Sequence, residues 1–265
     1  MNKQLTHTQA VFLMIAVTLM WSIAGVITRH LEHARSFEVT FWRSFFTVLS
    51  LLVILPFFQG REVFAKIRHG GRALWISGVC WSVMFTAFMV ALTLTSVANV
   101  LVTMALGPLF TALISRIFIG HRLPARTWAA IVVAGVGIVW MYGSQVSIGA
   151  PGVLAGSLVA LCVPIAGAVQ WTVAQRSQAH GEQLDLVPWV LVGAVISTAL
   201  TFPLSFPFMA TGTDIAWLGL LGLVQLAIPC TLSVVCARVL KAPEASLLAL
   251  LALTYALPAG PSTPA

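Results

Sequence analysis

The residue with the clearest chemical potential is Arg43, because it lies inside an apolar segment that runs from Val39 to Phe58. An ionisable group at the centre of a membrane-spanning helix costs about 2.5–3.5 kcal/mol, so such groups usually serve a function. Arg43 would lie about one helical turn inside the segment. There a guanidinium can face the interior and attract a carboxylate, or extend back to the lipid headgroups. Both interpretations remain open at the level of sequence.

Glu38 is the acidic residue nearest to Arg43 along the chain. A separation of five residues places two side chains about 140° apart around a helix, so we expect no ion pair between them. We expect Glu38 to be solvated at the helix entrance, with a role in proton coupling as the alternative.

Several aromatic and amide side chains fall in the middle or inner half of apolar segments. Aromatic walls with a few amides suit a pocket for a small amphipathic solute, although the same residue types also pack and hydrogen-bond between helices. The candidates for a substrate cavity are Arg43, Trp21, Trp81, Gln170, Trp171 and Gln225.

Prolines inside the apolar segments predict interruptions in several helices. Each one frees backbone carbonyls, which suits a helix that bends during transport, although a static kink tolerated by packing is the alternative. The helix-break candidates are Pro108, Pro164 and Pro229, and Pro203 shares the pattern.

No catalytic constellation is present: the chain lacks H-E-x-x-H, G-x-S-x-G and Walker motifs. The four cysteines lie in or at the end of apolar segments, without a C-x-x-C pair or a histidine at ligand spacing. They are Cys80, Cys162, Cys230 and Cys236. We therefore expect buried thiols and no catalytic residue, metal site, cofactor or ATP-driven step.

The elements that must position these residues are hydrophobic helices. Hydrophobic residues make up 59% of the chain and charged residues 8%, which is too few charges to coat a soluble globule. A span needs about 20 apolar residues, so we predict an all-α, polytopic protein whose partner is the lipid bilayer. The predicted spans are Ala10–Thr28, Val39–Phe58, Ala73–Leu92, Ala98–Ile119, Thr127–Tyr142, Gly152–Ala174, Val187–Met209 and Ile215–Cys236, and a shorter segment follows Glu244.

The net charge of +7 indicates orientation in the membrane and not a nucleic-acid partner. The basic residues lie in short gaps between apolar segments and form no continuous stripe. Arg43 lies within a predicted span. Of the other basic residues, Arg29 and Arg35 fall on the side of the membrane opposite to the N-terminus, and the rest fall on the same side as the N-terminus. This asymmetry predicts a multi-pass protein of the inner (plasma) membrane with a cytoplasmic N-terminus.

A weak internal repeat divides the chain. Ile23–Val26 resembles Ile165–Ala168, and Ser96–Asn99 resembles Lys241–Glu244, at separations of 142 and 145 residues. Two halves of five helices each would enter the membrane from opposite sides, which is the inverted repeat of many secondary transporters.

The chain resembles EamA-type members of the drug/metabolite transporter superfamily. The resemblance rests on Leu19–Gly25, Phe41–Ser44, Ser96–Asn99, Gly107–Leu113, Gly120–Leu123 and Gly135–Val139. It implies ten helices in two inverted halves, cytoplasmic termini, and transport of small metabolites, often as export. His121 departs from the family pattern, since an acidic residue usually occupies that place.

The resemblance divides the chain into a first five-helix repeat (residues 1–147), an incomplete second repeat (148–251) and a divergent Pro/Ala-rich tail (252–265). The repeat would place a tenth helix beyond Ala265, and the segment between Glu244 and Pro258 is shorter than the roughly 17 residues that a span needs. We therefore expect a truncated second half and impaired transport by this chain.

These observations predict a secondary transporter that moves a small organic metabolite by alternating access, with export of amino-acid-like or drug-like solutes favoured by the resemblance. The alternative is a membrane-embedded enzyme or a non-transporting scaffold subunit. A coupling ion and a homodimer are left open, and no nucleic acid is expected.

Overall fold

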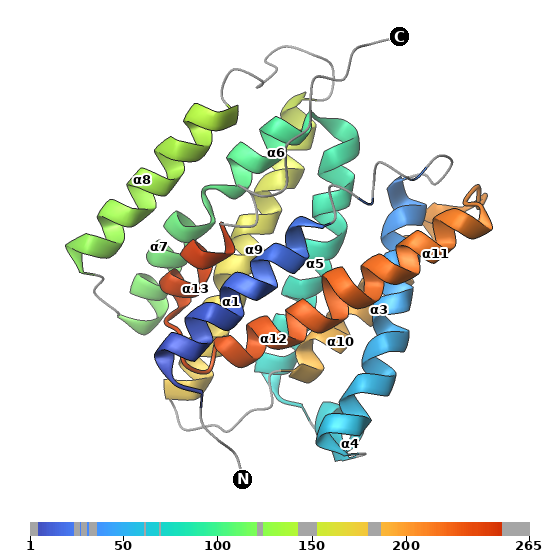
Figure 1. The fold of residues 1–265 in the computed structure, drawn as a ribbon, viewed down its shortest axis with the longest axis horizontal. Helices are drawn as coiled ribbons and strands as arrows, with labels where there is room; N and C mark the ends of the chain where they lie inside the picture. The colour runs from blue at the N-terminus through green and yellow to red at the C-terminus, as the bar shows by residue number, and fades with distance from the viewer. Residues whose placement is uncertain are drawn as a thin grey trace.

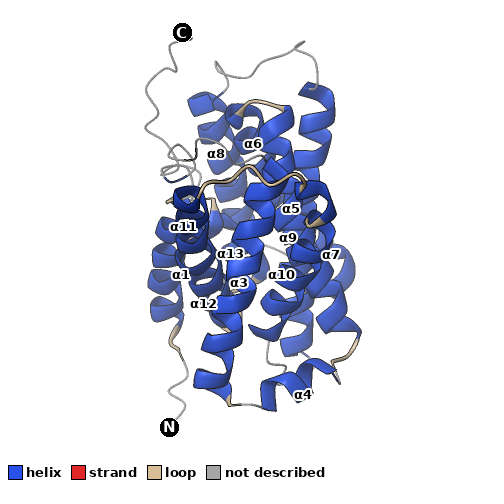
Figure 2. Cartoon of the chain, turned by 90° about the vertical axis from the view of Figure 1, so that its right-hand side faces the viewer, coloured by secondary structure: helices blue, strands red, loops and turns tan. Residues whose placement is uncertain are grey.

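The protein is a bundle of helices in the computed structural model (Figure 1). The structure describes residues 5–23, 27, 31, 36–60, 62–68, 70–120, 124–142, 153–179 and 187–250, and this part of the chain contains helices but no strand (Figure 2). Helices satisfy their backbone hydrogen bonds internally, which lipid requires of a spanning segment. The predicted all-α, polytopic fold class is confirmed.

The elements follow the apolar segments closely. The first part of the chain forms α1 (His7–Ser22), α3 (Ser36–Gln59), α4 (Glu62–Arg68), α5 (Arg72–Leu94), α6 (Val97–Met104), α7 (Gly107–Ile119) and α8 (Ala125–Tyr142). The second part forms α9 (Val153–Ala179), α10 (Val187–Thr201), the 3₁₀ turn η3 (Pro203–Ser205), α11 (Gly212–Leu220), the π-helical segment η4 (Leu221–Ala227), α12 (Ile228–Cys236) and α13 (Ala242–Ala249).

Five stretches of the described chain are long and apolar enough to cross a membrane. They are Phe37–Pro56, Arg72–Leu94, Val97–Ile119, Val153–Ser177 and Gly212–Cys236. Three shorter apolar helices, His7–Ser22, Ala125–Trp140 and Val187–Thr201, correspond to the remaining predicted spans.

The predicted span Val187–Met209 is too long at its C-terminal end. The helix ends at Thr201, and the chain continues through a 3₁₀ turn that begins with Pro203. A proline has no backbone N–H to donate and its ring disfavours the helix before it, so Pro203 and Pro207 prevent α10 from continuing.

Large apolar side chains also cover the outside of the bundle. Val53 on α3, Ile117 on α7 and Trp140 on α8 are all strongly exposed, with Trp140 at 89%. Soluble monomers rarely expose so many large apolar groups together, whereas lipid tails solvate them. These helix faces are the lipid-facing surface.

The interior is built around α5, which packs against α9, α10 and α3. Helix α10 also packs against α3, while α1 packs against α12 and α13. A close approach joins α5 to α10 at Gly78 and Gly193, where an added Cβ at Gly193 would collide with Trp81. Small residues of this kind let two membrane helices approach at backbone distance.

Candidate functional site

Arg43 is buried in the interior of the bundle on α3. Its side chain is 3% exposed, and Nη2 donates a hydrogen bond to the backbone carbonyl oxygen of Phe85 on α5 at 3.1 Å. Its Nε is buried without a hydrogen-bond partner. The guanidinium therefore points toward α5 in the interior of the bundle.

The π-helical segment η4 passes directly over Arg43. Thr47 Oγ1 donates both to the Arg43 carbonyl oxygen at 2.8 Å and to the Gly222 carbonyl oxygen at 3.1 Å. A Cβ added at Gly222 would lie 2.8 Å from the Arg43 carbonyl oxygen and 2.7 Å from Phe46 Cβ, so only glycine fits there. π-helical segments are rare and often occur at functional sites.

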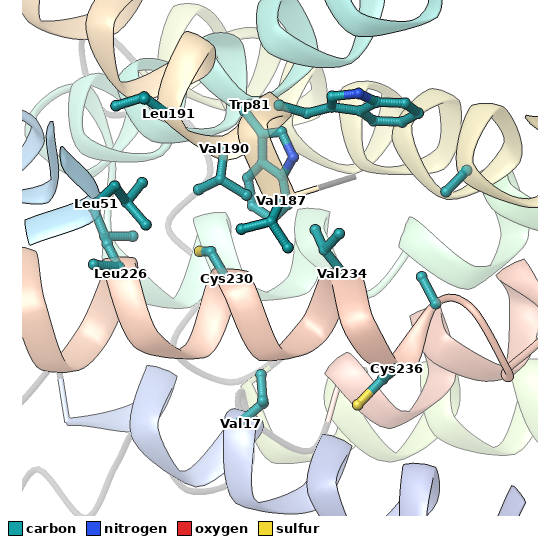
Figure 3. Packing of buried hydrophobic residues seen from close by; sticks show 14 of the residues in the cluster. Val17, Leu51, Trp81, Val187, Val190, Leu191, Leu226, Cys230, Val234 and Cys236 are labelled. Carbon is teal, nitrogen blue, oxygen red and sulfur yellow. The ribbon is translucent and has the colours of Figure 1, made fainter. Parts of the chain in front are cut away.

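Cys230 is a buried thiol on α12, the helix that continues from η4. Helix α12 packs against α1, which carries Trp21. In Figure 3, Cys230 points from α12 toward Val190 on α10, while Val17 of α1 approaches α12 from the opposite side.

Trp81 and Gln225 contribute two further buried polar atoms without partners. Trp81 lies one turn before Phe85 on α5, with its ring centroid 5.5 Å from that of Phe85, and its Nε1 has no acceptor. Gln225 lies on η4 one turn after Gly222, which contacts the Arg43 backbone, and its Oε1 has no donor. The elements that carry Trp81 and Gln225, α5 and η4, both pack against α3.

The other two candidates, Gln170 and Trp171, lie on α9. Gln170 Oε1 accepts a hydrogen bond from the Ser77 hydroxyl of α5, and Trp171 packs within the main hydrophobic core. The Gln170 side chain thus joins two helices, as the alternative interpretation of these residues describes.

A network of hydroxyl groups next to Arg43 was not singled out from the sequence. The Ser44 and Ser197 hydroxyl oxygens are 3.1 Å apart, and Thr86 Oγ1 lies 3.0 Å from the same Ser197 oxygen. The network links α3, α10 and α5. Serine and threonine are common in membrane helices, so residue type alone could not distinguish these three.

Glu38 differs from the expectation of a solvated carboxylate. It is fully buried, and it accepts hydrogen bonds from the backbone N–H groups of Met209 and Ala210 at 3.0 and 2.8 Å. The Trp42 Nε1 also donates to it at 3.4 Å. A buried carboxylate persists where hydrogen-bond donors replace water, and here two backbone donors come from a distant loop.

The helix-break candidates fall into two groups. Pro108 lies at the start of α7, after a turn at residues 105–106 that divides the fourth predicted span, and Pro229 lies at the start of α12, directly after η4. Pro164 instead lies inside α9, which continues through it as one helix, so the expected interruption does not occur there.

Some predicted features lie outside the described residues. They include Arg29, Arg35, His121 and the tail at residues 252–265. Within the described part of the chain, no group of three His, Cys, Asp or Glu side chains could hold a metal ion.

The fold and the sequence both have known relatives. A solved structure, described only as "Crystal structure of protein", superposes on this chain with a TM-score of 0.71. The match covers 95% of this chain and 86% of that one at 17% identity, so it shows a shared fold. No curated protein matches this sequence. The family model of the EamA-like transporter family matches residues 8–143, and the chain therefore belongs to this family of membrane transporters of the drug/metabolite type.

Proposed function

We propose that the protein is a secondary transporter that moves a small, amino-acid-like organic metabolite by alternating access. The observation that carries this proposal is the burial of Arg43 in the middle of the bundle with one hydrogen bond and an unpartnered Nε. Family membership supports transport, and the surroundings of Arg43 support the class of solute.

A buried guanidinium needs a compensating charge. Burying an unpaired ion costs several kcal/mol even after relaxation of the protein. Among the described residues, no acidic side chain forms a salt bridge with Arg43, because Glu38 binds the backbone of a distant loop. An anionic substrate would supply the missing charge while it is bound, which makes a carboxylate the preferred group.

The neighbouring unpartnered atoms extend this argument to an amino acid. Arg43 Nε and Trp81 Nε1 are donors, which suit the two oxygens of a carboxylate. Gln225 Oε1 is an acceptor, which suits an ammonium group. Two donors and one acceptor on α3 and on two elements that pack against it match a zwitterion better than a cation or a neutral drug.

The packing of the helices supports an inverted repeat. In the first half, α5 packs against α9 and α10 of the second half, and α7 packs against α9. Their counterparts by chain order pack in the same way, since α12 packs against α1, η4 against α3, and α13 against α1. Gly78 and Gly222 occupy equivalent close contacts, 144 residues apart. Two such halves can rock around a shared site.

The proposal includes location and direction. We place the protein in the plasma (inner) membrane with a cytoplasmic N-terminus, and we propose export as the direction of transport. A cysteine introduced at Arg68 should be protected from a membrane-impermeant maleimide in intact cells. Labelling of this cysteine in intact cells would show that the orientation is reversed.

Flux through the purified protein tests the proposed function. Proteoliposomes should exchange radiolabelled amino acids of the preferred class, and unlabelled carboxylates should compete whereas organic cations should not. Cells that overproduce the protein should also resist toxic amino-acid analogues. Absence of flux across a panel of amino acids, organic acids and cations would favour a scaffold subunit or an enzyme.

A further inference from the structure

The loop between η3 and α11 crosses the start of α3 and is fastened there by Glu38. We call residues 206–211 the strap. Two successive backbone N–H groups of the strap, from Met209 and Ala210, donate to the Glu38 carboxylate at 3.0 and 2.8 Å. The strap is not helical, so Glu38 provides acceptors that regular structure does not.

The strap separates Glu38 from the outside of the molecule. Phe206 and Met209 are 56% and 50% exposed, whereas Glu38 beneath them is 0% exposed. Phe208 packs its ring against Phe41 and Trp42 of α3, with centroid distances of 5.5 and 5.7 Å. The strap therefore covers Glu38. Its outer side is exposed, and its inner side is held by the Glu38 carboxylate and by the packing of Phe208 against Phe41 and Trp42.

Both α3, which carries Glu38, and the strap are connected along the chain to the surroundings of Arg43. On α3, Glu38 precedes Arg43 by five residues, a rise of about 7.5 Å along the helix. On the other side, the strap runs directly into α11, at the left of Figure 2, and α11 continues into η4, which contacts Arg43 through Gly222. A movement of the strap would therefore be transmitted through one nine-residue helix to the site.

We propose that the strap is a gate over the Arg43 site at this end of the bundle and that Glu38 is its latch. The inference rests on the transport function proposed above. Alternating access requires the halves of the protein to separate at one end, and the strap belongs to the second half whereas α3 belongs to the first. Opening exchanges the two hydrogen bonds to Glu38 for bonds to water, so the open state is accessible to a conformational equilibrium.

Accessibility of a buried thiol tests the latch directly. The reporter is Ser44→Cys, next to Arg43, in a background in which Cys80, Cys162, Cys230 and Cys236 are replaced by alanine. We expect Glu38→Gln to raise the rate of labelling by an impermeant maleimide about tenfold. Loss of one charge-assisted hydrogen bond shifts the equilibrium between closed and open strap by about that factor. The rise should occur from the strap side only, as comparison of intact cells with inside-out vesicles will show.

The matched control is Glu244→Gln, because Glu244 pairs with His7 at the start of α1, away from the strap. This variant should not raise labelling from the strap side. An unchanged labelling rate in Glu38→Gln, or an equal rise in Glu244→Gln, overturns the gate.

A second variant does not depend on the stability of Glu38→Gln. In Glu38→Cys/Ala210→Cys, a short bis(methanethiosulfonate) cross-linker, which forms a disulfide with each cysteine and releases methanesulfinate, should stop flux, and reduction should restore it. Full flux in the cross-linked protein overturns the gate even if labelling rises. A tenfold rise in labelling by a protein that moves no tested solute supports the gate and contradicts the proposed function, so the two failures are distinguishable.

Discussion

Two buried charges on the same helix, Glu38 and Arg43, are treated in opposite ways by the fold. Glu38 receives three hydrogen bonds, two of them from backbone N–H groups that lie 171 and 172 residues further along the chain. Arg43 makes one hydrogen bond, to a backbone carbonyl, and its Nε has no partner. Both side chains are almost completely removed from solvent.

The difference separates a structural charge from one that is free to bind a ligand. A carboxylate with enough donors stabilises the arrangement that supplies them, and its removal strands those donors. A buried guanidinium with unused donors destabilises the protein when no ligand is bound, and a bound anion would offset that cost. The comparison predicts opposite signs for stability when each charge is removed.

The largest effect is expected at Arg43. Arg43→Met should reduce flux of the amino-acid-like solute on the order of a hundredfold, the usual scale for loss of one partner in a buried charge pair. Arg43→Lys should retain more flux than Arg43→Met, because it keeps the charge but loses the planar fork of donors. Initial rates in proteoliposomes at matched protein density measure both.

The same variant provides the control for folding. Arg43→Met should unfold at the same temperature as the unsubstituted protein or at a higher one, since it removes an uncompensated buried charge. A variant that loses flux and also unfolds early would show that Arg43 is structural, and the contrast with Glu38 would disappear.

The second effect is a loss of stability at Glu38. Glu38→Ala leaves the N–H groups of Met209 and Ala210 without their acceptor, and each stranded donor costs about 1–3 kcal/mol if it stays buried. We expect a total loss of roughly 2–6 kcal/mol, with a smaller loss for Glu38→Gln, which keeps one acceptor. Thermal unfolding in detergent, followed by tryptophan fluorescence, measures it, and an unchanged midpoint would contradict the assignment.

Sequence reasoning succeeded where a single property dominates. Long apolar segments predicted the helices well, because hydropathy decides whether a segment is stable in lipid. Arg43 was identified because a charge inside such a segment is costly wherever it points. The bounds of α5 differ from the prediction by no more than two residues at either end.

The remainder depends on contacts between distant residues. The solvation of Glu38 was predicted incorrectly because its donors are backbone groups, which carry no sequence signal. The strap itself exists because α10 ends before Pro203, whereas the apolar composition of residues 202–209 suggested more helix. The hydrogen bond of Gln170 with Ser77 likewise requires the pairing of α5 with α9.

A third, smaller effect is expected where η4 meets Arg43. Gly222→Ala would place a methyl group 2.8 Å from the Arg43 carbonyl oxygen and 3.0 Å from the Thr47 backbone nitrogen. Overpacking of this kind typically costs about 1–3 kcal/mol. It should also lower flux, because the displaced η4 carries Gln225.

Gly219→Ala is the matched control on the preceding turn. Its added Cβ would lie 3.6 Å from the Phe46 ring, which is an ordinary contact. We expect nearly unchanged stability and flux, since the new methyl group fits without displacement. Equal behaviour of the two variants would show that the close approach of η4 to α3 does not matter.

The smallest effect is expected at the contact between His7 on α1 and Glu244 on α13. His7 Nε2 lies 2.9 Å from Glu244 Oε1, and the two side chains are 60% and 36% exposed. Solvent screens such a pair, and its contribution is typically below about 1 kcal/mol. We therefore expect Glu244→Gln to change the unfolding temperature far less than Glu38→Gln, although each substitution removes one carboxylate that links two segments of the chain.

High salt should remove the remaining difference in unfolding temperature between Glu244→Gln and the unsubstituted protein. It should leave the effect of Glu38→Gln intact, because a buried carboxylate is screened much less. A loss in Glu244→Gln as large as that in Glu38→Gln would mean that burial does not distinguish these two links.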